Sequence, residues 1–291
     1  MNNTESRAHV RLRFFKIAAI IIAALSAITA AFAFLVSSEP ETRYLSLSAA
    51  TVAMYSVIGV SVAVAFSSLF LFKGHSIVKD ESQEFEILSL LPAVGAFIVI
   101  IDRILSAVPN GKPSLTDVLL IVTAIVASLL SVAKAFKLSA TVKMIASYSQ
   151  IFFTLIFISY LYLEPKVEIN APVKLLAQFA LAAVALSTLS NIRIMIERSM
   201  AGAYVFTKIC LASLAFSAAA ATVTAIAMSA DKYPRAYLSA SLFALCYSIH
   251  ALIEFFRAEV KAKTQESTPT EPIPEAVTDE TVETAPENDG E

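Results

Sequence analysis

Eight long apolar runs follow one another along the chain, separated by short polar segments. They occupy residues 14–36, 45–72, 87–108, 115–136, 144–163, 173–195, 203–230 and 236–256. A helix rises about 1.5 Å per residue, so roughly 20 apolar residues cross a hydrocarbon layer about 30 Å thick. The pattern therefore predicts an all-α fold, a polytopic bundle of about eight transmembrane helices in a lipid bilayer.

The polar segments between the runs are of two kinds. Four of them contain proline, which ends helices and starts turns, and these are SSEPETRY, VPNGKPS, EPKVEINAP and ADKYPR. The alternate segments are charged and compatible with helix, so we expect them to prolong helices past the membrane surface: KGHSIVKDESQEFE, KAFKLSATVK and NIRIMIERSMAG. The chain is therefore predicted to form four hairpins.

The composition supports a membrane environment. Hydrophobic residues make up 57% of the chain, charged residues only 16%, and the mean hydropathy is +0.71, which is too apolar for a soluble protein of this length. The first run resembles a signal peptide with a cleavage site at Ala31–Phe32–Ala33. Its length of about 20 residues exceeds the usual 7 to 15 of a signal core, so we expect a retained first helix.

Lysine and arginine are distributed unevenly between the two sides of the predicted membrane. One side receives fifteen of the 22, namely Arg7, Arg11, Arg13, Lys16, Lys73, Lys79, Lys134, Lys137, Lys143, Arg193, Arg198, Lys208, Arg257, Lys261 and Lys263. The other seven are Arg43, Arg103, Lys112, Lys166, Lys174, Lys232 and Arg235. Short cytoplasmic segments carry such an excess. We therefore expect an integral protein of the plasma (cytoplasmic) membrane, with both termini cytoplasmic, a basic N-terminus over 1–13 and the bundle over 14–258.

The last part of the chain, residues 264–291, has a different composition. It is rich in Pro, Thr and Glu, and the stretch from Glu266 to Glu291 holds nine acids and no base, so the rest of the chain carries −2 + 9 = +7. Such a segment cannot bury enough apolar surface to offset its ordering entropy. We expect a disordered cytoplasmic tail, which either increases solubility or docks a protein partner.

Two of the runs present small residues at four-residue spacing. The run 203–230 has Ser213, Ser217, Ala221, Ala225 and Ser229, and the run 14–36 has Ala19, Ala23, Ala27 and Ala31. Small residues let membrane helices approach closely. These stripes are expected to pack within the bundle or, as an alternative, to form a seam between copies in a homo-oligomer.

The run 87–108 contains LLPAVGAF, in which Pro92 lacks an amide hydrogen and Gly95 follows about one turn later. Proline inside a helix removes a hydrogen bond and produces a kink. The pair therefore predicts a kink and a candidate hinge, although both residues are also common in ordinary membrane helices.

Asp102, Arg103 and Asp117 form one candidate site, on either side of a predicted turn. The hairpin would bring Arg103 close to Asp117, and the three could bind a ligand. The segment Ser114–Leu115–Thr116–Asp117 also fits a capping box, in which side chains satisfy the first amides of a helix. A cap with an ion pair at the membrane rim is the simpler interpretation.

Two further candidates lie at the opposite, inner side. His250 and Glu254 are one helical turn apart, and a carboxylate beside an imidazole suits a pH sensor. Asn191, Arg193 and Glu197 lie near the inner end of the run 173–195. In both cases the simpler interpretation is a polar edge of a membrane helix.

The sequence contains no motif for soluble catalysis. The patterns GxxxxGK[ST], GxGxxG and GxSxG are absent, and Cys210 and Cys246 belong to no metal-binding cluster. We therefore expect no enzyme activity, no cofactor, no metal and no nucleic-acid partner. The predicted function is a membrane-embedded accessory or scaffold subunit. The alternative is a carrier or channel for a small, neutral solute.

Overall fold

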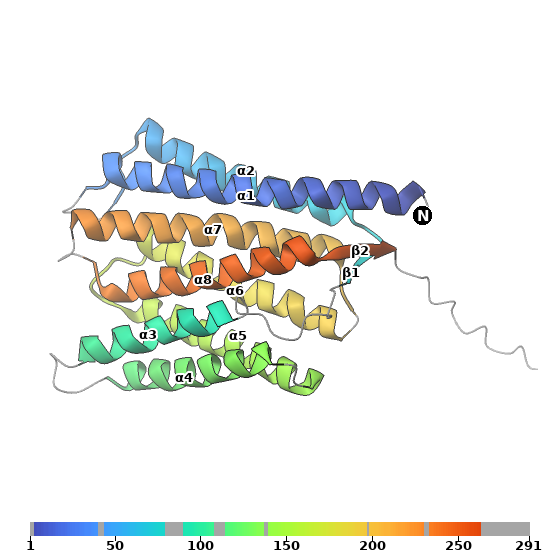
Figure 1. The fold of residues 1–291 in the computed structure, drawn as a ribbon. Helices are drawn as coiled ribbons and strands as arrows, with labels where there is room; N and C mark the ends of the chain where they lie inside the picture. The colour runs from blue at the N-terminus through green and yellow to red at the C-terminus, as the bar shows by residue number, and fades with distance from the viewer. Residues whose placement is uncertain are drawn as a thin grey trace, which may run out of the picture.

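The computed structural model describes residues 3–39, 44–78, 90–107, 114–136, 139–196, 198–229 and 233–262. Within these ranges the chain forms eight helices and one pair of short strands (Figure 1). In chain order they are α1 (Asn3–Ser37), α2 (Ala49–Leu71), β1 (His75–Val78), α3 (Leu91–Ala107), α4 (Leu115–Ala135), α5 (Ala140–Leu163), α6 (Pro172–Met195), α7 (Ala201–Met228), α8 (Arg235–Arg257) and β2 (Glu259–Ala262).

The prediction of an all-α membrane bundle is confirmed. Seven of the helices, all except α3, are long and apolar enough to cross a membrane. The most apolar stretch of α4 is only 22% buried, and large apolar side chains such as Leu119, Val122 and Leu129 are exposed on it. Such a surface requires lipid as its surroundings. The corresponding stretches of α6, α7 and α8 are each 61% buried, so these three helices form the centre.

Five helices form a closed ring. Each of α3, α4, α5 and α6 contacts the next, α6 contacts α8, and α8 returns to α3. We call this arrangement the five-helix ring. Helix α7 packs on its outside against α6 and α8, and α1 and α2 pack on α7 as an outer layer (Figure 1).

The two ends of the bundle differ. The start of α1 lies at the same end as β1 and β2, and we call this the termini end (Figure 1). Helices α2, α4, α6 and α8 begin at the opposite end, which we call the turn end (Figure 1). There, Tyr44 donates its hydroxyl hydrogen to the Glu168 carboxylate, and this hydrogen bond raises the pKa of Tyr44. The contact joins the segment before α2 to the segment before α6.

Helix α1 begins at Asn3, well before the predicted start at residue 14. The bases in its first turns lie against the carboxyl ends of other helices, where the helix dipole favours positive charge. Arg11 Nη1 donates to the Leu71 carbonyl at 3.1 Å, and Lys16 Nζ donates to the carbonyls of Phe256 and Ala258 at 2.8 Å each. The basic segment is therefore part of the folded termini end.

The segment after α2 does not prolong that helix, which corrects the expectation for KGHSIVKDESQEFE. Gly74 adopts a φ of 78° and turns the chain, which is a conformation that favours glycine. Strand β1 then pairs antiparallel with β2, from His75 opposite Ala262 to Val78 opposite Glu259. Residues 79–89 lie outside the described residues.

The small-residue stripe on α7 is used inside the chain. Ser213, Ser217, Ala221 and Ala225 are buried, and Ser229 forms the end of the helix. Ser26 of α1 faces the stripe, with its Oγ 2.9 Å from Ser213 Oγ. This packing corrects the alternative in which the α7 stripe forms a seam between copies. On α1, Ala19 and Ala23 are buried, whereas Ala27 and Ala31 are half-buried.

The predicted kink at Pro92 is wrong. Helix α3 begins at Leu91, so Pro92 occupies its first turn, where no amide hydrogen bond is lost. Gly95 serves close packing instead, because a Cβ at this position would lie 3.1 Å from Phe243 Cα and 3.2 Å from Cys246 Cβ. Gly95 therefore allows the close contact between α3 and α8.

Candidate functional site

A cavity of about 670 Å³ lies inside the five-helix ring, toward the termini end. All five ring helices and strand β1 contribute to its wall. The wall residues are Ser76, Ile77, Val78, Pro92, Ser131, Lys134, Lys143, Ala146, Gln150, Thr188, Asn191, Ile194, Met195, Ser199, Tyr247, His250 and Glu254. The volume lies within the range of sites that bind small organic molecules.

A network of polar side chains forms one side of this wall. Asn191 Nδ2 donates to Glu254 Oε2 at 3.0 Å, and His250 Nε2 lies 3.6 Å from Glu254 Oε1. Lys208 Nζ lies 3.5 Å from Glu254 Oε2 and donates to Ser187 Oγ at 2.9 Å and to Asn191 Oδ1 at 3.2 Å. We call these five residues the Lys208 cluster.

The Lys208 cluster connects three helices. Ser187 and Asn191 lie on α6, Lys208 lies on α7, and His250 and Glu254 lie one turn apart on α8. Lys208 is only 1% exposed and His250 8% exposed. The Nζ atom also lies 4.9 Å from the centre of the Tyr204 ring, a favourable position for a cation. The structure thus places the predicted pair of His250 and Glu254 in the cavity wall.

Gln150 of α5 lies on the wall and is 3% exposed. Ser131 Oγ donates to its Oε1 at 3.2 Å, while its Nε2 atom is buried and has no hydrogen-bond partner among the described residues. Nearby, the hydroxyls of Thr188 and Tyr247 are 2.7 Å apart. A buried amide donor without a partner costs about 1–3 kcal/mol, unless a bound molecule or water accepts its hydrogen.

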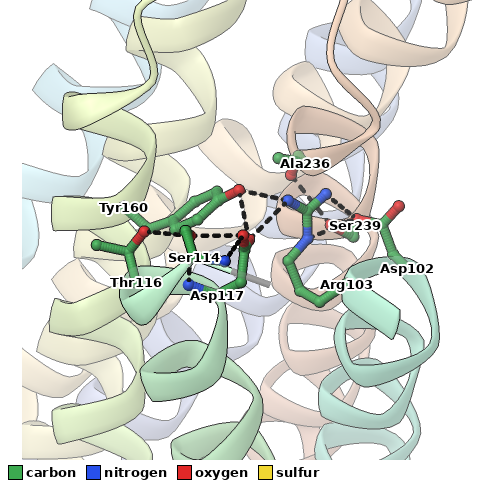
Figure 2. Close-up of polar contacts among 8 residues, drawn as sticks. All are labelled: Asp102, Arg103, Ser114, Thr116, Asp117, Tyr160, Ala236 and Ser239. Carbon is green, nitrogen blue, oxygen red and sulfur yellow. Dashed lines mark hydrogen bonds and ion pairs between the residues drawn. The ribbon is translucent and has the colours of Figure 1, made fainter. Parts of the chain in front are cut away.

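A second polar cluster lies at the turn end, and Figure 2 shows its contacts. Arg103 Nη2 lies 2.6 Å from Asp102 Oδ2, and Nη1 lies 3.7 Å from Asp117 Oδ1. Arg103 also donates to the Tyr160 hydroxyl, which donates in turn to Asp117 Oδ1 at 3.0 Å. Ser239 Oγ donates to Asp102 Oδ2 at 2.8 Å. We call these five residues the Arg103 cluster.

The Arg103 cluster joins four of the ring helices. Asp102 and Arg103 come from α3, Asp117 from α4, Tyr160 from α5 and Ser239 from α8. Arg103 is 5% exposed. The expected approach of Arg103 to Asp117 is therefore confirmed, and so is the capping box at Ser114, because its hydroxyl and the Asp117 carboxylate satisfy each other's backbone amides.

Other predicted site residues take no part in the two clusters. The Arg193 side chain donates to the Met200 sulfur at 3.7 Å. Glu197 lies outside the described residues. Pro92 lines the cavity, and Gly95 packs against α8. No group of three His, Cys, Asp or Glu side chains able to hold a metal occurs in the described ranges.

Sequence reasoning missed Lys208 and Gln150 as site residues. Lys208 was assigned to the inner rim, although it lies seven residues inside α7, and this depth is the signal that could have identified it. Gln150 lies mid-way along an apolar run, where a polar amide is uncommon. The identity of their partners follows only from the packing of the helices.

Comparison with known proteins yields no match to a family model, to a curated protein or to a solved structure.

Proposed function

We propose that this protein is a membrane-embedded carrier that binds a small organic solute in the cavity of the five-helix ring. The observation that supports this most directly is the amide of Gln150, a residue of the cavity wall whose buried Nε2 atom has no hydrogen-bond partner in the described residues. A purely structural bundle gains nothing from such a group, because burial of an unsatisfied donor is unfavourable. A solute with an acceptor atom would satisfy it.

We further propose that the chain crosses the membrane eight times, with α3 as a short crossing, and that the termini end is cytoplasmic. The excess of fifteen Lys and Arg residues over seven supports this orientation. In this arrangement the cavity lies on the cytoplasmic side of the plasma membrane, and the Arg103 cluster lies toward the outside.

The Arg103 cluster has the properties of a closed gate in this proposal. Carriers open a central site alternately to the two sides of the membrane. Hydrogen bonds and ion pairs of the Arg103 cluster hold α3, α4, α5 and α8 together at the turn end, while the cavity lies at the other end. The structure then corresponds to an inward-facing state, and outward opening requires these contacts to break.

Native mass spectrometry of the full-length protein, extracted gently from its own membrane, tests the proposal. We expect a reproducible small-molecule mass bound to the protein, reduced about tenfold in Gln150→Leu because one hydrogen bond is lost. Gln178→Leu is the matched control, since Gln178 is a half-buried glutamine of α6 that does not line the cavity. Uptake of the identified molecule into proteoliposomes then tests transport.

The accessory role is the competing proposal, and the same experiment decides between them. Truncation of the protein after Lys263 removes the acidic tail. A protein partner that binds stoichiometrically and is lost on truncation, with no retained small molecule, would contradict the carrier proposal. A small molecule that is retained by both versions would contradict the accessory role.

A further inference from the structure

We propose that the solute is an organic anion, recognised through its carboxylate or phosphate oxygens by Lys143 and Gln150 on the wall of the cavity. This inference rests on the proposed function, because it names the chemical class of the solute that the carrier binds. It differs from the small, neutral solute of the carrier or channel that the sequence offered as the alternative function.

The acceptor groups of the wall are already engaged. Glu254 provides the only carboxylate among the described wall residues. Its Oε2 atom accepts from Asn191 and pairs with Lys208, and its Oε1 atom faces His250. The Oε1 atom of Gln150 likewise accepts a hydrogen bond from Ser131. A solute therefore finds these acceptors occupied.

Two donor groups of the wall residues have no partner among the described residues. The Lys143 side chain forms no ion pair with another described residue, and the Nε2 atom of Gln150 has no partner there. Both residues lie on α5 at a spacing of seven, with Ala146 between them on the same wall. Positions i, i+3 and i+7 share one face of a helix. One face of α5 thus presents an ammonium group and, about 10 Å deeper, an amide donor.

The remaining wall suits the carbon skeleton of such a solute. Ile77, Pro92, Ala146, Ile194 and Met195 are apolar, and the volume of about 670 Å³ exceeds that of a simple inorganic ion. The solute is therefore expected to have a carboxylate or phosphate group near Lys143 and an apolar or hydroxylated carbon skeleton. Either a soluble organic acid or the headgroup of an anionic lipid has this chemistry.

The organic-anion assignment is tested on the full-length protein in phosphatidylcholine nanodiscs. The probes come in pairs whose members have similar size but different charge. The probes are 4-phenylbutyrate with its neutral amide, and glucose 6-phosphate with glucose. A parallel sample contains phosphatidylglycerol in the nanodisc. We expect an acid, or phosphatidylglycerol, to raise the melting temperature by about 2 °C or more at saturation, with no rise from the neutral partners.

Lys143→Gln should abolish this rise, whereas Lys166→Gln, an exposed base at the turn end, should retain it. A rise caused by a soluble acid identifies a free organic anion, and a rise caused only by phosphatidylglycerol identifies a lipid headgroup.

Equal effects of an acid and its neutral partner, or a rise that persists in Lys143→Gln, would overturn the anion assignment. If a neutral probe binds in a manner that Gln150→Leu abolishes, the carrier proposal stands and only the anion assignment fails. If no probe binds and no mass is retained in the native spectra, both fail.

Discussion

At the scale of single residues, Lys208 shows how this bundle accommodates a buried charge. An uncompensated ammonium in the membrane interior costs at least about 2.5–3.5 kcal/mol. Lys208 Nζ has a carboxylate on α8 and two neutral oxygens on α6 within 3.5 Å, and a tyrosine ring beside it. Its partners therefore offset the cost of burial and fix three helices relative to one another.

The ion pair of Lys208 with Glu254 predicts non-additive stability effects. Glu254→Gln takes away the carboxylate that pairs with the Lys208 ammonium, and Lys208→Met takes away the ammonium that pairs with the Glu254 carboxylate. The double variant removes both charges, so it should be more stable than the sum of the two single effects predicts, by about 1–3 kcal/mol. Melting temperatures of the purified variants measure this coupling. Strictly additive losses would show that the pair contributes nothing.

Only part of this residue-level chemistry is accessible from the sequence. The contact of Arg103 with Asp117 is predictable, because one short turn joins the helices that carry them. The contact of Lys208 with Glu254 is not, because it requires α7 to pack against α8 in one particular rotation. Gln150 escapes prediction for the same reason, since its chemistry depends on helices that the hydrophobic pattern does not pair.

At the scale of elements, the contact between α2 and α7 depends on Gly202. A Cβ at this position would lie 2.7 Å from the Ser68 carbonyl oxygen and 2.8 Å from Leu69 Cα, and both are backbone atoms that cannot rotate away. Ser68 Oγ also donates to the Gly202 carbonyl at 2.9 Å. The absence of a side chain thus lets two helix backbones approach, and the Ser68 hydroxyl then reaches the Gly202 carbonyl.

Gly202→Ala should therefore separate α2 from α7 and lower the melting temperature clearly. Gly59→Ala is the matched control, because Gly59 lies inside α2 with no atom within 4 Å of the added Cβ. The control should be neutral or stabilise by about 0.5–1 kcal/mol, since alanine favours helix more than glycine does. Equal melting temperatures for the two variants would show that the close contact is unimportant.

The elements themselves follow closely from the hydrophobic pattern. The start and end of α6 lie within one residue of prediction, because Pro172 begins the helix and the apolar run ends with it. The start of α1 was misplaced, since its bases are stabilised by the ends of α2 and α8. Strand β1 was missed because its partner, β2, lies far away in the sequence. Both errors arise where distant segments, and no local pattern, determine the structure.

At the scale of the whole molecule, the proposed orientation and gate predict which side can reach Gln150. In a background with Cys210 and Cys246 replaced by alanine, Gln150→Cys should resist a membrane-impermeant maleimide on intact cells. Adding Arg103→Gln should expose it, because the contacts that close the turn end are lost. Arg235→Gln is the control, because it removes an exposed base at the same end. It should leave the cysteine at position 150 protected from the maleimide.

Two further single-cysteine variants calibrate this measurement. Lys166→Cys at the turn end should react on intact cells, and Ser76→Cys on β1 should react only in inverted vesicles. The opposite pattern would reverse the proposed orientation. Labelling of Gln150→Cys that is independent of Arg103 would refute the gate.

The pairing of β1 with β2 links the cavity to the rest of the chain. Ser76, Ile77 and Val78 of β1 line the cavity, and β2 ends at Ala262, two residues before the segment 264–291 that is the expected acidic tail. A protein that holds the tail can therefore transmit tension to the cavity wall through one strand pair. Because linkage is reciprocal, a solute that shifts β1 must alter the affinity for that protein by the same factor. Under the proposed function, a partner bound to the tail would sense through this strand pair whether the cavity is occupied.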